Sequence, residues 1–213
     1  TQAALQGRHG AKAQVAAIGQ AGENLSRIAS IGVNEGSAAG QGGFGAVMGS
    51  KNLKAVVAIG ERRTPMAHPE ECRAFLRAMA QEYVADREKR SRLQGLSGRP
   101  PGRRAPCGRG CLFPCATRYE GVRGTVHPDR DYAGVAQCAS FRYGGSRDGL
   151  WNLGFDAGFE LNMLANDWGI NHWDVLKGLY AWLAMCQRDG LLAEIGGRAV
   201  DPADPRFWYD VLA

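Results

Sequence analysis

Hydrophobic and polar positions along the first part of the chain follow the periods of β-strands and of one short helix. Residues 11–19 alternate well enough to predict a strand. Residues 53–59 form a β-branched run that Gly60 ends, and this predicts a buried strand. Between them, residues 21–29 predict a short helix with an acid in its first turn. The pattern therefore indicates a β-containing part that ends near residue 63.

After Pro65 the apolar residues take on helical spacing. Residues 69–90 predict an amphipathic helix. Its apolar face comprises Cys72, Phe75, Leu76, Met79 and Tyr83. Residues 119–128 predict a small hairpin, and the chain is helical again from residue 150 onward. We therefore expect an α+β protein, with the end of a β-containing domain at 1–63 and a mainly α-helical domain at 64–213.

Caps mark the helices of the second half. Asn171, with Asp174 three residues later, predicts a helix N-cap, and Gly190 fits the position just past the end of that helix. We expect this helix to bury Val175, Leu176, Leu179, Trp182, Leu183 and Met185. A further helix is expected to begin near Arg206.

Composition places the chain among globular proteins. Of 213 residues, 45% are hydrophobic and 22% are charged, which excludes a disordered tail, a fibrous protein and a disulfide-packed mini-protein. We expect no signal peptide, because residues 1–10 lack a charged segment followed by an apolar one, and no apolar run approaches the roughly 20 residues that cross a bilayer. We expect a cytoplasmic protein without a membrane partner. Because the sequence lacks an initiator Met and stops within a predicted helix, we expect it to be a piece of a longer protein.

The net charge of +5 is concentrated in one block. Between Arg87 and Arg109, Glu88 is the only acid among many basic residues. Such a block could track phosphates, but it lacks interleaved aromatic residues and contains a Gly/Pro loop. We interpret it as a solvated loop and expect no nucleic-acid partner.

Glycine is enriched, at 30 of 213 residues, and it clusters between residues 36 and 49. Residues 40–45 fit G-x-G-x-x-G, but no buried strand directly precedes them, so a dinucleotide fingerprint is not supported. The order of Ser50 and Lys51 excludes a Walker A loop. Consecutive glycines expose backbone N–H groups to a bulky anionic ligand. The alternative is a tight turn that packs a helix on a sheet.

The cysteines form a second cluster. Cys107, Cys111 and Cys115 place three thiols within nine residues on a Gly/Pro-containing loop, which suits an iron–sulfur cluster. Structural zinc is the rival, although its usual second cysteine pair is missing. Cys72 and Cys186 lie on apolar helix faces, and we interpret both as core residues.

Two of these segments resemble a known family. Residues 19–25 (Gly-Gln-Ala-Gly-Glu-Asn-Leu) and 38–55, which contain the glycine cluster, resemble the tungsten-dependent aldehyde ferredoxin oxidoreductases. The resemblance implies two pyranopterins whose phosphates are joined by magnesium. It implies a backbone carbonyl ligand at Ala38 or its neighbours, and a phosphate-lining role for Gly40, Gly42 and Gly43. The chain departs from the family at Gln20, usually Pro, and at Ser37 and Gln41, commonly Arg. The two lost cations weaken phosphate neutralisation.

The resemblance extends to the second half of the chain. The family carries C-x2-C-x3-C for a 4Fe–4S cluster, which matches Cys107, Cys111 and Cys115 with one extra residue in the first gap. The implied fourth ligand lies beyond Ala213, with Cys138 as the alternative. A pterin-contacting D/N-x-x-G-L-D motif matches Asn166, Gly169, Ile170 and Asn171. The alternative is that Gly169 ends one helix and Asn171 caps the next.

The proton-handling residues are the least clearly marked. The family's Pro-Glu-Tyr-Glu pattern has its nearest match at residues 128–131, which makes Asp129 and Asp131 candidate catalytic carboxylates if burial raises their pKa. The alternative is a solvated loop. His127 and His172 are candidate proton donors, or else a turn residue and a first-turn helix residue.

The resemblance implies an oxidoreductase that oxidises aldehydes to carboxylic acids. Its electrons would pass from a tungsten (or molybdenum) bis-pyranopterin through the 4Fe–4S cluster to ferredoxin or an electron-transfer subunit. A related tungsten aryl-CoA reductase of the benzoyl-CoA type is the alternative, with an aryl-CoA substrate in place of a small aldehyde. A non-catalytic zinc or nucleic-acid-binding module is the alternative of another class. A homo-oligomer remains open.

Overall fold

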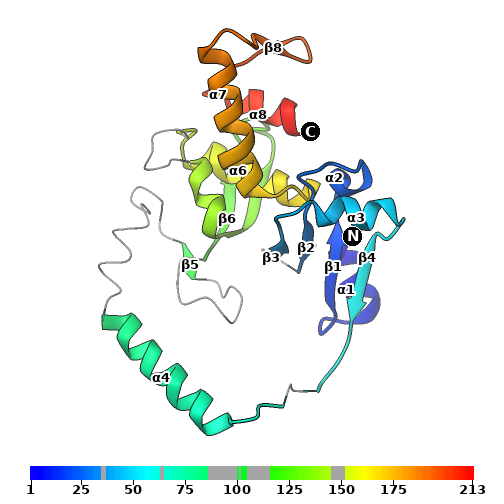
Figure 1. Ribbon diagram of the computed structural model, residues 1–213, viewed down its shortest axis with the longest axis vertical. Coiled ribbons are helices and arrows are strands. Elements are labelled where there is room, and N and C mark those ends of the chain that lie inside the picture. The colour runs from blue at the N-terminus through cyan, green and yellow to red at the C-terminus, as the bar shows by residue number, and fades with distance from the viewer. Residues whose placement is uncertain (35–36, 63–64, 86–99, 101, 105–115, 145–151) are drawn as a thin grey trace.

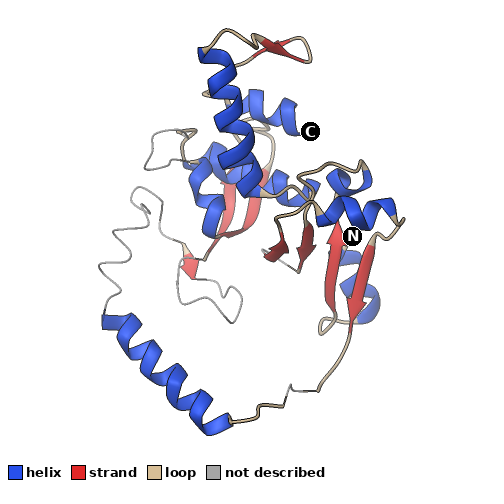
Figure 2. Cartoon of the chain, viewed as in Figure 1, coloured by secondary structure: helices blue, strands red, loops and turns tan. Residues whose placement is uncertain are grey.

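The computed structural model describes residues 1–34, 37–62, 65–85, 100, 102–104, 116–144 and 152–213 (Figures 1 and 2). They form helices and antiparallel sheets, which confirms the predicted α+β class. The helical elements are α1 (Gln2–His9), α2 (Gln20–Glu23), α3 (Phe44–Ser50), α4 (Pro69–Ala85), η1 (Cys138–Tyr143), α6 (Phe155–Trp168), η2 (Asp174–Leu179), α7 (Tyr180–Arg188) and α8 (Pro205–Leu212). The strands are β1 (Gln14–Ile18), β2 (Ile31–Val33), β3 (Ser37–Ala39), β4 (Ala55–Ala58), β5 (Arg103–Arg104), β6 (Thr117–Arg123), β7 (Asp131–Ala136), β8 (Glu194–Ile195) and β9 (Arg198–Ala199).

The first part of the chain builds a four-stranded antiparallel sheet in the order β3-β2-β1-β4. β1 lies between β2 and β4, with Ala16 opposite both Val33 and Val56. β4 confirms the strand expected at 53–59 but not its burial, because it is an edge strand on which Val56 is exposed. The helix expected at 21–29 is shortened to α2, and Leu25 beyond it has a left-handed φ of 57° that a continuing helix does not allow.

A second sheet, in the order β5-β6-β7, packs against α6. The expected hairpin is confirmed and is longer than predicted, since β6 and β7 pair over most of their length around a turn at 124–130. Tyr119 on β6 contacts the rings of Phe155 and Phe159 on α6 at centroid distances of 4.8 and 5.4 Å. This apolar contact fixes α6 across the hairpin.

The largest apolar cluster joins η1, α6, η2, α7 and α8. Its largest fully buried side chains are Tyr143, Leu176, Leu183, Phe207 and Trp208. Cys186 is buried, as expected. Trp182 and Met185 were expected to be buried, and this is wrong: both are exposed, because α7 turns Leu183 and Cys186 toward the cluster instead.

The helix expected at 69–90 is confirmed as α4 over Pro69–Ala85, but its apolar face joins no apolar cluster of the described residues. Phe75 is 64% exposed and Leu76 is also exposed, while Cys72 is only partly buried. Figure 1 shows α4 apart from the sheets and the other helices. Among the described residues, no helix is both long and apolar enough to cross a membrane.

Candidate functional site

The glycine cluster forms the turn that connects β3 to α3. Gly42 and Gly43 have left-handed φ values of 91° and 67°, a conformation that glycine adopts without a steric penalty. Gly43 is buried, and a Cβ there would lie 2.7 Å from the carbonyl oxygen of Arg27. Gly43 is therefore required for close packing, as the tight-turn interpretation states.

Other members of the cluster remain at the surface. Ala38 lies exposed on β3, an edge strand whose outer backbone groups have no neighbouring strand in this sheet. Gly40 is partly exposed and Gly42 is exposed. This stretch of backbone carries no side chain larger than a methyl at these three positions, so a bulky ligand could approach it.

The structure brings the second predicted motif to the glycine turn. Gly169 ends α6 with a φ of 74°, and its carbonyl accepts a hydrogen bond from the Ser30 N–H at 2.7 Å. The Asn171 N–H donates to the Ile28 carbonyl at 2.9 Å. A Cβ at Gly40 would lie 2.8 Å from Asn171 Oδ1. We call residues 38–43 together with 166–171 the cradle.

The buried members of the cradle hold its shape. Asn171 accepts a hydrogen bond from the Trp173 N–H at 3.3 Å and donates to Asp174 at 2.7 Å, which confirms the predicted cap. Ile170 is part of the main apolar cluster. Asn166, by contrast, is exposed. The helix-end and capping interpretation therefore describes Gly169 and Asn171, and Asn166 is the member of this motif that is open to a ligand.

A chain of polar side chains, His172 and Tyr143, holds Asn166 in place. His172 Nε2 lies 2.9 Å from Asn166 Oδ1, and His172 Nδ1 lies 3.0 Å from the Tyr143 hydroxyl. Burial lowers the pKa of His172 to about 4 and raises the pKa of Tyr143 above its usual value. The neutral imidazole donates from Nε2, since an amide oxygen only accepts, and receives the Tyr143 hydroxyl at Nδ1. Beyond it, Asn166 lies 3.5 Å from Asn162, whose buried Nδ2 has no hydrogen-bond partner among the described residues.

Of the candidate carboxylates, Asp129 lies on the turn between β6 and β7, and Asp131 is the first residue of β7. Asp129 is exposed, and Asp131 is exposed and paired with Arg123 at 2.9 Å. Both carboxylates are exposed in this structure, so the solvated-loop alternative describes both.

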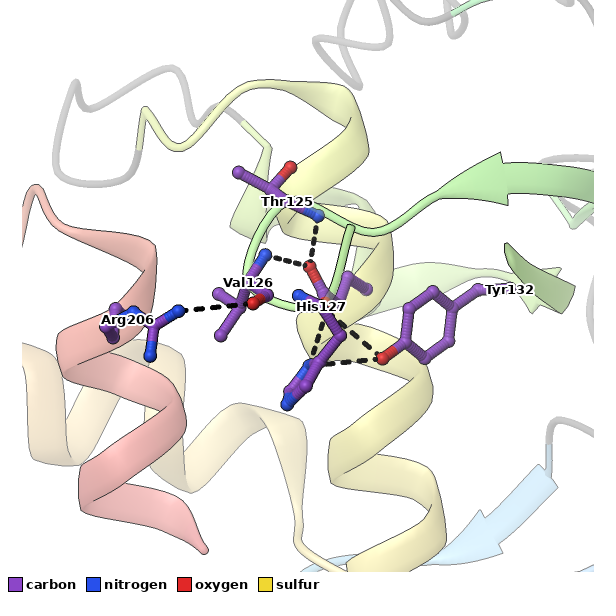
Figure 3. A network of polar contacts seen from close by, with 6 residues as sticks. Thr125, Val126, His127, Tyr132 and Arg206 are labelled. Atoms are coloured by element: carbon purple, nitrogen blue, oxygen red, sulfur yellow. Dashed lines mark hydrogen bonds and ion pairs between the residues drawn. The ribbon is translucent and has the colours of Figure 1, made fainter. Parts of the chain in front are cut away.

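The structure places a different acid beside His127. Glu160 on α6 is 1% exposed and accepts hydrogen bonds from three successive backbone N–H groups, those of Thr125 (2.6 Å), Val126 (2.8 Å) and His127 (3.0 Å) (Figure 3). The sequence patterns did not single out this residue. Its signal was an acid between two large apolar residues, Phe159 and Leu161, within the buried stretch of α6.

The predicted cluster ligands Cys107, Cys111 and Cys115 lie outside the described residues. Cys138, the alternative fourth ligand, is exposed at the start of η1. Within the described part of the chain, no group of His, Cys, Asp and Glu side chains is arranged to hold a metal ion.

Comparison with known proteins gives consistent matches. Residues 1–60 match the family model for the aldehyde ferredoxin oxidoreductase N-terminal domain. A tungsten-containing aldehyde ferredoxin oxidoreductase of Pyrococcus abyssi is 53% identical over 68 residues, which is 32% of this chain and 11% of that protein. An aliphatic sulfonate oxidoreductase, WOR-like subunit, of Pyrococcus furiosus is 54% identical over 54 residues, 25% of this chain and 9% of that protein.

A solved structure is similar over almost the whole chain. It is the active site complex BamBC of benzoyl coenzyme A reductase in complex with 1,5-dienoyl-CoA. The TM-score is 0.61 at 20% identity, and the match covers 99% of this chain and 38% of that one. At this identity the likeness concerns the fold alone. The matched regions span only a minor part of the length of these relatives.

Proposed function

We propose a function from one premise: through its first 60 residues, this chain belongs to the aldehyde ferredoxin oxidoreductase family. The proposed function is that of a tungsten-pterin oxidoreductase whose cofactor lies against the cradle. The observation that carries the proposal is the meeting of Gly40 with Asn171, because it joins two segments that the family resemblance had marked separately.

The polar groups of the cradle fit such a cofactor. The edge-strand carbonyls at and beside Ala38 are oxygen ligands of the kind that magnesium prefers. Gly40 and Gly42 allow phosphate oxygens to approach the backbone N–H groups. Asn166, which His172 holds in place, offers an amide to the polar edge of a pterin. Gly43, Gly169, Ile170 and the capping residue Asn171 keep these groups in position.

When bound, the tungsten pterin would supply the two-electron acceptor. The proposed reaction takes an aldehyde and water to a carboxylic acid, two protons and two electrons. The electrons would leave one at a time through a 4Fe–4S cluster held by Cys107, Cys111 and Cys115, with a fourth ligand elsewhere, and pass to ferredoxin. The protein's own tasks are to bind the phosphates, exclude water and accept the protons.

A second candidate is the active-site subunit of an aryl-CoA reductase. Its support is a likeness of fold: the solved complex matches 99% of this chain at 20% identity. The same cradle would serve that enzyme, with electrons entering through the cluster and protons being supplied to the substrate.

Metal analysis of the intact protein that contains this sequence tests the proposal. We expect tungsten, or molybdenum, together with about four irons per chain. Zinc alone would refute the proposal and favour the non-catalytic module. Reduction of a viologen dye by a panel of aldehydes, compared with turnover of aryl-CoA thioesters, then separates the two enzyme candidates.

A further inference from the structure

Glu160 contacts the imidazole of His127 in addition to the backbone of the turn. Its Oε1 lies 2.8 Å from His127 Nδ1, and the Tyr132 hydroxyl donates to the same oxygen at 3.1 Å. Among the described residues, the side chains on this carboxylate that can move a proton are His127 and Tyr132. The turn is fixed on its outer side by Arg206, which donates to the Val126 carbonyl at 3.3 Å (Figure 3).

The carboxylate is ionised. Burial alone raises the pKa of Glu160, but the hydrogen bonds from the Val126 N–H, the His127 imidazole and the neighbouring backbone N–H groups outweigh it, so this pKa lies below its usual value. Burial, with the adjacent Glu160 charge, raises the pKa of Tyr132 to about 12. Tyr132 therefore keeps its proton, and both Glu160 oxygens act only as acceptors.

An acceptor at 2.8 Å requires a hydrogen on His127 Nδ1. In a neutral imidazole the other nitrogen, Nε2, then carries the lone pair. Figure 3 shows the far edge of the His127 ring turned away from the turn, and the side chain is 21% exposed. Nε2 is thus the nitrogen that a proton can reach.

We propose that Glu160 is a positioning residue that holds neutral His127 as the Nδ1–H tautomer, so that Nε2 accepts a proton released at the cradle. This use of the dyad rests on the proposed function. Oxidation of an aldehyde, RCHO + H2O → RCOOH + 2 H⁺ + 2 e⁻, sends both electrons to the cofactor and leaves two protons to remove. Nε2 takes up one of them, the resulting imidazolium is paired with the Glu160 carboxylate, and the proton then passes to water.

Two aromatic contacts lie between His127 and the cradle. The His127 ring meets the edge of Tyr209 at a centroid distance of 4.5 Å, and Tyr209 meets Trp168 at 5.5 Å. Trp168 directly precedes Gly169 of the cradle. A clamp that only fastened the turn would need the three backbone hydrogen bonds but not the imidazole, so the tautomer of His127 separates the two roles.

Nitrogen-15 NMR of histidine-labelled protein reads this tautomer directly. Spectra at about pH 9, above the ordinary imidazole pKa of ~6.5, should give a protonated Nδ1 and an unprotonated Nε2 for His127. His127→Gln assigns the signal, and the exposed His9 and His68 show the mixture of an unrestrained ring. A protonated Nε2 in the unmutated protein would overturn the proposal, whether or not any variant folds.

Two substitutions at the same carboxylate provide the comparison. Glu160→Gln turns an amide N–H₂ toward backbone donors and should abolish the tautomer preference. Tyr132→Phe removes one hydrogen bond from the same oxygen and should leave the preference intact. Loss of the preference in Tyr132→Phe, or its survival in Glu160→Gln, would contradict the assigned role of Glu160.

The last comparison uses the intact enzyme with its metals. His127→Gln should lower turnover by about 10²–10⁴-fold, the usual contribution of a positioned proton acceptor, at unchanged tungsten content. Unchanged turnover and pH profile at full metal content would refute the proton-accepting role and leave the proposed function standing. Absence of both tungsten and molybdenum from the unmutated protein would refute the proposed function instead, while the tautomer result would still stand.

Discussion

His172 illustrates, at the scale of one residue, how burial couples to pH. Its folded-state pKa of about 4 lies below the value of ~6.5 for an unfolded chain. As the pH falls below ~6.5, His172 binds a proton in the unfolded state but not in the folded state. Above pH ~6.5 this proton uptake has no effect on stability. Between pH ~6.5 and pH ~4 it should lower the free energy of unfolding by about 3 kcal/mol. Urea titrations across this range measure it.

His172→Gln is the control for this prediction. Because the variant cannot titrate at this position, the difference between its unfolding free energy and that of the unmutated chain should vary between pH ~4 and ~6.5 and be constant above. Parallel curves for both proteins through that window would show that His172 does not keep the folded pKa given to it by burial.

Single residues were predictable where their role is local. Asn171 and Gly190 were assigned from neighbours within a few positions, and both occupy the expected helix ends. Glu160 was missed because its hydrogen-bond partners lie 28 to 35 residues away, on a hairpin that no periodicity places against α6. The glycine turn was foreseen, but which of its glycines pack and which stay exposed depends on the distant segment around Arg27.

Two amphipathic helices differ at the scale of the element. Phe75 on α4 is 64% exposed, and Phe159 on α6 is 3% exposed. We expect Phe159→Ala to lower the free energy of unfolding by about 3–5 kcal/mol, because it removes a ring from a packed cluster. Phe75→Ala should change it by no more than ~0.5 kcal/mol. Chemical denaturation of the same chain measures both, and an equally large loss for Phe75→Ala would mean that α4 packs against another part of the chain.

The sequence predicted the positions of helices and strands better than the surfaces against which they pack. Helical spacing over 69–90 correctly located α4, yet spacing states only that one face is apolar, not that a surface exists to cover it. The same limit applies to β4, which was expected to be buried from its composition and lies at the edge of its sheet. Element position follows from local propensity, while burial follows from the topology of the sheet, which residues far along the chain decide.

At the scale of the whole molecule, backbone contacts join the first sheet to the helical part. Ala29 forms an isolated β-bridge with Ile170, and Gly19 lies directly against the backbone of Trp168 and Gly169. Of the described residues in the first part, Ala21 and Ile28 pack on the main apolar cluster. The division into 1–63 and 64–213 stays a prediction. Residues 38–43 of the cradle lie in the first of these parts, and residues 166–171 lie in the second.

The junction should therefore be sensitive to one methyl group at Gly19. A Cβ there would lie 2.6 Å from the Gly169 N atom, and backbone on both sides must move to admit it. Gly19→Ala should lower the free energy of unfolding by about 1–3 kcal/mol. Gly7→Ala is the matched control, since Gly7 lies within α1 with nothing within 4 Å of a Cβ, and alanine there should be neutral or stabilise by up to ~1 kcal/mol.

The same pair of variants links the junction to the cofactor. If the cradle binds a pterin across the two parts, Gly19→Ala in the intact protein should retain less tungsten per chain than Gly7→Ala, because Gly40 and Asn166 no longer face one ligand from fixed positions. Equal tungsten in both variants, with Gly19→Ala measurably destabilised, would show that the junction serves folding alone and that the cofactor is held by one side of the cradle.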